Sequence, residues 1–118
     1  MWFSIDFHSH KPVYIQIKEN IKEIVLNGLL NPGDFIPSIR TLAKDLGVNL
    51  NTVARAYREL EQEGVIKVER GEGYTVVGVN KDEIKNAILE EFRMILLKLK
   101  KTGVTKQQII TIINSVIE

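Results

Sequence analysis

The chain has no cysteine among its 118 residues, which excludes disulfide bonds, cysteine-ligated zinc and thiol catalysis. Residues 1–6 lack the basic flank and apolar run of a signal peptide. No segment approaches the roughly 20 consecutive apolar residues that a membrane-spanning helix needs. We therefore expect a cytoplasmic protein without a membrane partner.

A marked excess of either charge is also missing, because the formal net charge is +1. This balance excludes a globally basic nucleic-acid binder but leaves room for a local basic face. Residues 38–58 carry four basic side chains against one acidic side chain, a local net charge of +3. Charge layout alone fits an ordinary mixed surface at least as well.

Residues suited to catalysis or metal binding are sparse. His8 and His10 lie near a terminus that we expect to fray, with no carboxylate cluster close to them in the sequence. The acidic residues are scattered over charged faces, and residues 71–73 are too short for a phosphate-binding fingerprint. We expect no enzymatic activity, no metal site and no cofactor.

Apolar residues at helical spacing predict three helices, over residues 12–26, 38–47 and 49–63. Ser38 and Asn49 are suited to cap the second and third of these, and Gly47 supplies the turn between them. Two β-type runs, residues 65–69 and 74–77, flank a glycine-rich turn and predict a hairpin.

The last third of the chain is predicted to form two more helices. The expected fold class is therefore α+β and mostly α: a winged helix-turn-helix with a short C-terminal helical dimerisation tail. We expect a DNA-binding domain over residues 1–77 and a two-helix dimerisation tail over residues 78–118.

The helix over residues 49–63 is the expected recognition helix, which enters the DNA major groove. At about 100° per residue, Asn51, Arg55 and Arg58 lie about 140° to 200° from Val53, on the side opposite the expected core. Asparagine can pair with adenine, and arginine with guanine or phosphate. The alternative is a packed helix pair with an incidental polar face.

Further residues around this helix are candidate DNA contacts. They are two cations, hydroxyl and amide groups, and the residues of a hairpin that would serve as the wing: Ser38, Arg40, Lys44, Asn49, Thr52, Arg70, Gly71 and Gly73. Solvated cations, helix capping and turn geometry explain the same residues without DNA.

Residues 10–77 carry several motifs in order: Val13-Tyr14-Ile15-Gln16-Ile17, Pro37-Ser38-Ile39-Arg40, Leu46-Gly47-Val48, Asn51-Thr52-Val53 and Tyr57-Arg58-Glu59-Leu60-Glu61. This segment resembles the winged-helix domain of GntR-family transcription regulators. The resemblance implies a dimeric regulator that binds a near-palindromic double-stranded DNA operator. Arg40 matches an arginine with which the family contacts phosphate or bases.

Residues 49–57 and the short two-helix tail resemble the YtrA subfamily. That resemblance implies pairing through the tail and a repressor, often of transporter genes. Leu50 and Ala54 stand where many family members have arginine, so base reading is expected to rest on Asn49, Asn51 and Arg55.

The tail is rich in large apolar side chains that a monomer would leave exposed, so we expect a homodimer. The expected dimerisation residues are Ile84, Ile88, Phe92, Ile95, Leu96, Leu99, Ile109, Ile113 and Val116. The alternative is a tail that folds back onto its own winged domain.

Two further hypotheses stay open at this stage. The alternative function is a winged helix used as a protein–protein interaction module without sequence-specific DNA binding. The Gly78–Asn80 hinge and the habits of the family also suggest a small-molecule effector, bound between the winged domain and the tail.

Overall fold

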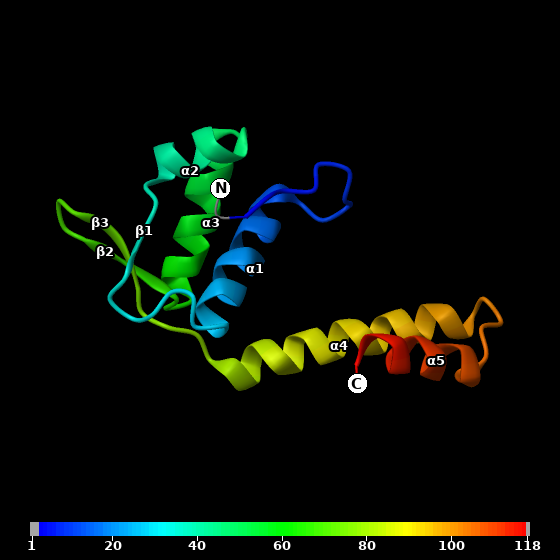
Figure 1. Ribbon diagram of the computed structural model, residues 1–118. Helices are drawn as coiled ribbons and strands as arrows, with labels where there is room; N and C mark the ends of the chain where they lie inside the picture. The colour runs from blue at the N-terminus through cyan, green and yellow to red at the C-terminus, as the bar shows by residue number, and fades with distance from the viewer. Residues whose placement is uncertain (1–2, 118) are drawn as a thin grey trace. The chain divides into compact units, whose positions relative to one another are not determined.

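The structure is a computed structural model that describes residues 3–117 (Figure 1). The chain divides into two compact units, one ending at Val79 and the other beginning at Asn80. The first unit contains α1 (Val13–Leu26), β1 (Phe35–Ile36), α2 (Ile39–Leu46), α3 (Leu50–Gln62), β2 (Ile66–Glu69) and β3 (Gly73–Val76). The second contains α4 (Lys81–Lys100) and α5 (Lys106–Val116). The predicted α+β, mostly α, winged fold is confirmed.

Short polar signals fix the ends of α2 and α3. The Ser38 hydroxyl accepts the backbone N–H of Thr41 at 3.1 Å, and the Asn49 side-chain oxygen accepts that of Asn51 at 2.7 Å. Gly47, between the two helices, has a φ of 68°, which strains any residue with a Cβ. Both predicted caps and the predicted turn are confirmed.

One side of α3 is completely buried. Val53, Ala56, Tyr57 and Leu60 are all 0% exposed, on the side that the helical angles predicted. They pack in one hydrophobic cluster with Ile17 and Ile21 of α1, Leu42 of α2, and Ile66 and Val76 of the sheet. This core holds α3 by one side and leaves the other side open.

Tyr57 ties α3 to the segment that enters α2. Its ring meets Tyr74 edge to face at 5.0 Å, and its hydroxyl donates to the carbonyl oxygen of Pro37 at 2.6 Å. Burial raises the pKa of the Tyr57 phenol, so the hydroxyl stays protonated and keeps this bond.

The sheet has three antiparallel strands in the order β1-β3-β2. The predicted β2–β3 hairpin is confirmed, with Ile66 opposite Val76 and Glu69 opposite Gly73. The sequence predicted no strand at residues 35–37, whereas Phe35 pairs with Thr75 and Ile36 with Tyr74. Such long-range pairing of a two-residue strand leaves no local pattern in the sequence.

From residue 3 on, the N-terminal segment that we expected to fray is anchored to α1 and to the core. The side chain of Gln16 accepts the backbone N–H of Asp6 and donates to the carbonyl oxygens of Asp6 and Lys11. Phe3 and Ile5 pack against the core. A glutamine in the first turns of a helix looks solvated in the sequence, so these bonds were missed.

The second unit is a pair of helices, with α5 returning beside the C-terminal part of α4 (Figure 1). The Asn80 side chain caps α4, and Thr105 with Gln108 forms a capping box at the start of α5. Neither helix contains a buried residue. Within residues 3–117, no helix is both long and apolar enough to cross a membrane.

Replacing Tyr57 with phenylalanine should lower the free energy of unfolding by about 1 kcal/mol, because the Pro37 carbonyl loses its partner. Urea denaturation followed by circular dichroism measures the change. Tyr74→Phe is the matched control: no hydrogen bond of its hydroxyl is found among residues 3–117, and about 0.5 kcal/mol or less is expected. Equal losses in the two variants would contradict this role for the Tyr57 hydroxyl.

Candidate nucleic-acid interface

The open side of α3 carries an amide and a guanidinium. Asn51 and Arg58 are both exposed, about 160° and 140° from the buried Val53. Neither side chain has a hydrogen bond or an ion pair with any part of the chain that the structure describes. Both groups are therefore available to a ligand placed against this side of the helix.

Other elements of the first unit carry exposed cations. Arg40 on α2, Lys44 on α2 and Arg70 at the tip of the hairpin are exposed. As with Arg58, no ion pair of theirs is found among the described residues, whereas four lysines elsewhere in the unit do have carboxylate partners. The positive charge of residues 38–58 is thus largely free to meet an anion.

Three of the predicted contact residues already serve the fold. The Ser38 hydroxyl caps α2 and also donates to the Thr41 hydroxyl at 2.9 Å. The Asn49 oxygen caps α3, which leaves only its NH₂ group for a ligand. Thr52 is half-buried. Capping, the simpler explanation for Ser38 and Asn49, is therefore part of their role.

Arg55 lies differently from Asn51 and Arg58, although the sequence placed all three together. Its Cζ atom is 3.7 Å from the centroid of the Tyr14 ring on α1, and its Nη2 donates to the Tyr14 hydroxyl at 3.0 Å. Its Nε donates to Glu59 at 3.1 Å. The guanidinium is turned toward α1, and its side chain remains 51% exposed.

Arg55 is one end of a row of polar contacts between α1 and α3, here called the polar ladder. Its members are Tyr14, Lys18 and Lys22 on α1 and Arg55, Glu59 and Glu63 on α3 and its C-cap. Tyr14 contacts Arg55, Lys18 contacts Glu59 at 2.9 Å, and Lys22 contacts Glu63. Each pair is separated by 41 residues, so the helices run in the same direction along this seam.

The lysine and glutamate side chains of the ladder stabilise each other's charged forms. Burial alone would lower the pKa of Lys18, but hydrogen bonds to Glu63 and Glu59 outweigh it and raise that pKa. Hydrogen bonds from Lys18 and Arg55 lower the pKa of Glu59. Burial would raise the pKa of Glu63, yet its bonds to Lys18 and Lys22 lower it. Lys18, Glu59 and Glu63 are thus charged near neutral pH.

The ladder is the feature that the sequence reasoning missed. Its signal was present, since Tyr14, Lys18 and Lys22 are spaced by four residues and so are Arg55, Glu59 and Glu63. The sequence analysis placed the acidic residues on charged faces and assigned them no partner. Which helix they face depends on tertiary packing, which one helical wheel does not contain.

The hairpin turn, residues 70–72, has the geometry of a wing tip. Gly71 and Gly73 have φ values of 76° and 114°, and no atom lies within 4 Å of a Cβ added at either position. The glycines are therefore required by backbone conformation and not by crowding within the protein. Turn geometry, the simpler explanation, accounts for both.

No group of three or more histidine, aspartate and glutamate side chains that could hold a metal ion occurs within residues 3–117. The features of the first unit are instead a helix-turn-helix, a β-hairpin wing and an open amide-and-cation side on the second helix. This combination defines the winged helix-turn-helix class of protein.

The comparisons with known proteins agree with that class. The chain matches the family described as bacterial regulatory proteins, gntR family, over residues 13–76. It is 42% identical to the HTH-type transcriptional repressor YtrA of Bacillus subtilis over 94 residues, 80% of this chain and 68% of the repressor. The chain belongs to the GntR family and is a DNA-binding transcription regulator, as the resemblance to that family and to YtrA proteins implied.

Solved structures give the same result. YtrA from Sulfolobus acidocaldarius, a GntR-family transcription factor, is 39% identical with a TM-score of 0.62, over 98% of this chain and 96% of that one. The DNA-binding domain of AraR, in complex with operator ORX1, is 27% identical with a TM-score of 0.57, over 62% of this chain and 94% of that one. The family consists of regulators and not of enzymes.

The polar ladder predicts acid sensitivity. The pKa values of Glu59 and Glu63 are lowered from 4.5 in the folded protein, so their contribution to stability is present above about pH 4.5. It is lost as the pH falls through the folded-state values. Urea midpoints measured from pH 7 to about pH 3 should therefore fall less steeply for the double variant Glu59→Gln, Glu63→Gln than for the wild type.

Glu61→Gln is the control on the same helix, since Glu61 is exposed and no ion pair of it is found among residues 3–117. It should keep the wild-type pH profile. Parallel profiles for the wild type and the double variant would show that the ladder carboxylates do not contribute.

Proposed function

We propose that this protein is a cytoplasmic homodimer that represses transcription by sequence-specific DNA binding. Its helix over residues 49–63 enters the major groove of a near-palindromic operator. The observation that carries the proposal is the open side of α3, where Asn51 and Arg58 have no partner among the described residues. Residues 1–77 form the DNA-binding domain, and residues 78–118 form the dimerisation tail.

The contacts divide by chemistry. Asn51, at the leading end of α3, is assigned to a base edge, with adenine as the matching base. Arg40, Lys44 and Arg58 are assigned to phosphates, as is Arg70 at the wing. Asn49 can donate to phosphate through its NH₂ group and Thr52 through its hydroxyl, and Ser38 can do so by turning its hydroxyl away from Thr41. Gly71 and Gly73 allow the wing backbone to come close to DNA.

The comparisons support the mode of action. One relative bears the name of a repressor, and AraR is a structural neighbour bound to its operator. Repression of transporter genes follows the habit of the YtrA subfamily. A winged helix used only for protein contact is disfavoured, because such a module gives no use to the unpartnered amide and cations.

Substitutions of Asn51 and Arg58 should weaken DNA binding in different ways. After a binding site is selected from random duplex DNA, Arg58→Gln should weaken binding to all duplexes and lower the salt slope by about 1, because one phosphate contact is lost. Asn51→Ala should leave the slope unchanged and relax the preference at one base pair, by about 1–3 kcal/mol.

Lys98→Gln in the tail is the charge-matched control, and its slope should equal that of the wild type. Affinities are measured by fluorescence anisotropy from 50 to 300 mM salt. A flat salt response of the wild type would instead favour the protein–protein module.

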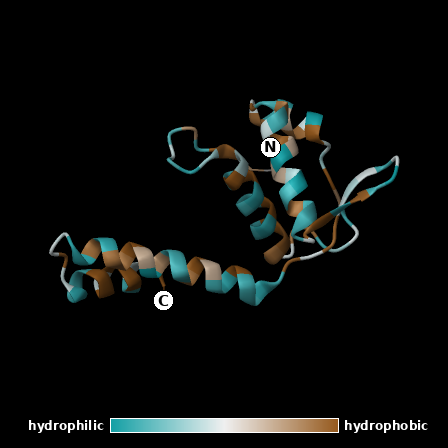
Figure 2. Ribbon diagram, turned by 180° about the vertical axis from the view of Figure 1, so that it is seen from behind, coloured by the Kyte–Doolittle hydropathy of each residue, from teal (hydrophilic) through white to brown (hydrophobic). Residues whose placement is uncertain are grey.

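The tail supports self-association because its apolar face is uncovered. Ile88, Phe92 and Ile95 are 57%, 43% and 53% exposed, on one side of α4. Ile113 and Val116 of α5 are exposed as well. Figure 2 shows apolar residues recurring along both helices. A contiguous apolar surface of this kind marks a partner interface, and a two-fold copy is the commonest partner.

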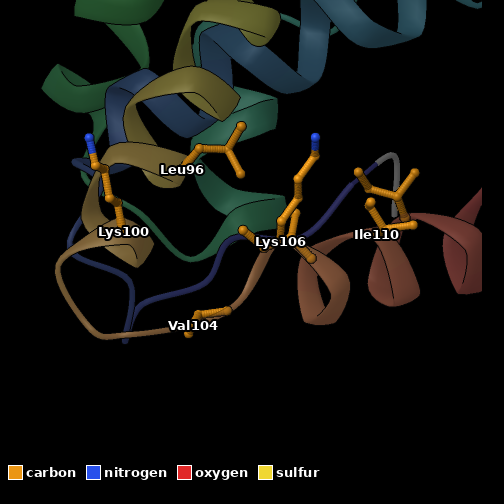
Figure 3. Close-up of a pocket in the computed structure, with 7 residues that line it drawn as sticks. Leu96, Lys100, Val104, Lys106 and Ile110 are labelled. Atoms are coloured by element: carbon orange, nitrogen blue, oxygen red, sulfur yellow. The ribbon is translucent and has the colours of Figure 1, made fainter.

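An open groove continues this apolar surface between α4 and α5. It is lined by Leu96, Lys100, Val104, Lys106, Ile109, Ile110 and Ile113. Figure 3 shows Leu96 and Lys100 on α4, Val104 in the connection, and Lys106 and Ile110 on α5. Leu96, Ile109 and Ile113 thus join Ile84, Ile88, Phe92, Ile95, Leu99 and Val116 as the proposed dimer contacts.

Phe92→Glu should convert the dimer into a monomer, because a charge would be buried in the interface. Sedimentation velocity at about 50 μM measures the oligomeric state, and operator affinity should fall with it. Asn86→Glu, about 120° round the helix from Phe92, is the control and should remain a dimer. A monomeric wild type would instead favour the folded-back tail.

A further inference from the structure

We propose that Arg55 is a positioning residue and not a DNA contact: through Tyr14 and Glu59 it fixes the recognition helix α3 against α1. The inference rests on the proposed DNA binding and changes the assignment of one residue within it. Sequence reasoning gave Arg55 a role in base reading.

The guanidinium of Arg55 points toward α1. One face of it lies on the Tyr14 ring at 3.7 Å, its Nη2 donates to the Tyr14 hydroxyl and its Nε donates to Glu59. Cation–π stacking on one side and an ion pair at one edge together hold the planar group in a single orientation. To reach a phosphate, the Arg55 side chain would have to leave both the Tyr14 ring and the Glu59 carboxylate.

Arg55 is the first α3 residue of the polar ladder. Arg55, Glu59 and Glu63 follow one row of α3, and each contacts a residue of α1 that is 41 positions earlier. Arg58 lies about 60° away from Arg55 around the helix, and no partner of it is found in the described part of the chain. Asn51 precedes Arg55 by one turn on the same row, about 40° away, yet no partner of its side chain is found in the described part of the chain either. The contacts with α1, and not the helical angle, therefore separate Arg55 from Asn51 and Arg58.

The polar ladder restricts the rotation of α3 more than the apolar core does. The apolar contacts of Ile17 and Ile21 with α3 are non-directional and tolerate small rotations of the helix. Hydrogen bonds at three successive turns of α3 do not tolerate such rotations, because each bond requires its own distance and angle. Arg55 is the member nearest the leading end of α3, so it fixes the rotation where Asn51 meets DNA.

The decisive variant is Tyr14→Leu, which removes the ring and leaves Arg55 free to reach DNA. A positioning role predicts that Tyr14→Leu and Arg55→Gln each lower affinity for the selected duplex about tenfold, with the salt slope unchanged. The double variant should be no weaker than the weaker single variant, because both break the same contact. Arg55→Lys should lose as much, since an ammonium keeps the charge but not the planar fit.

Arg58→Gln, with its slope lowered by about 1, is the reference for a true phosphate contact. A slope lowered by about 1 in Arg55→Gln, or wild-type affinity in Tyr14→Leu or Arg55→Gln, would overturn the proposal. Thermal unfolding without DNA gives an independent readout: the single variants should lower Tm by similar amounts, and the double variant by no more. Full additivity would also overturn it. If the wild type itself fails to bind the duplex, the proposed function fails, and the unfolding data still decide the role of Arg55.

Discussion

The structure depends on one constraint: α3 must be held firmly by one side while its opposite side stays bare. Four residues of α3 are completely buried, and they contact α1, α2 and the sheet within one core. The Tyr57 hydroxyl joins this helix to the entry of α2, and the polar ladder joins it to α1. With these attachments, the helix presents Asn51 and Arg58 at a fixed angle, which is what recognition of a rigid duplex needs.

Charge is divided between two uses in the first unit. Lys18, Lys22 and Arg55 are neutralised by the carboxylates of the ladder, whereas Arg40, Lys44 and Arg58 lie outside it. The net charge of +1 therefore hides three cations for which no carboxylate partner is found among the described residues. Acidic residues at the far end of α3 do not merely avoid phosphate, because two of them hold the helix in place.

Local signals in the sequence were enough to predict the helices, their caps and the hairpin. Ser38, Gly47 and Asn49 each act within a few residues of themselves, so their roles follow from residue type and spacing. The partner of Arg55 lies 41 residues away, and the pairing of β1 with β3 crosses about 40 residues. Contacts of this kind depend on how the elements pack. The angular argument therefore predicted the buried side of α3 correctly but did not separate Arg55 from Asn51.

Contact between the leading end of α3 and DNA can be tested directly, because the chain has no cysteine. A single cysteine at position 51, carrying a photoactivatable cross-linker, is compared with a single cysteine at position 61 near the other end of the helix. The account predicts cross-links to the selected duplex from position 51 and none from position 61. Cross-links from position 61 without any from position 51 would contradict it.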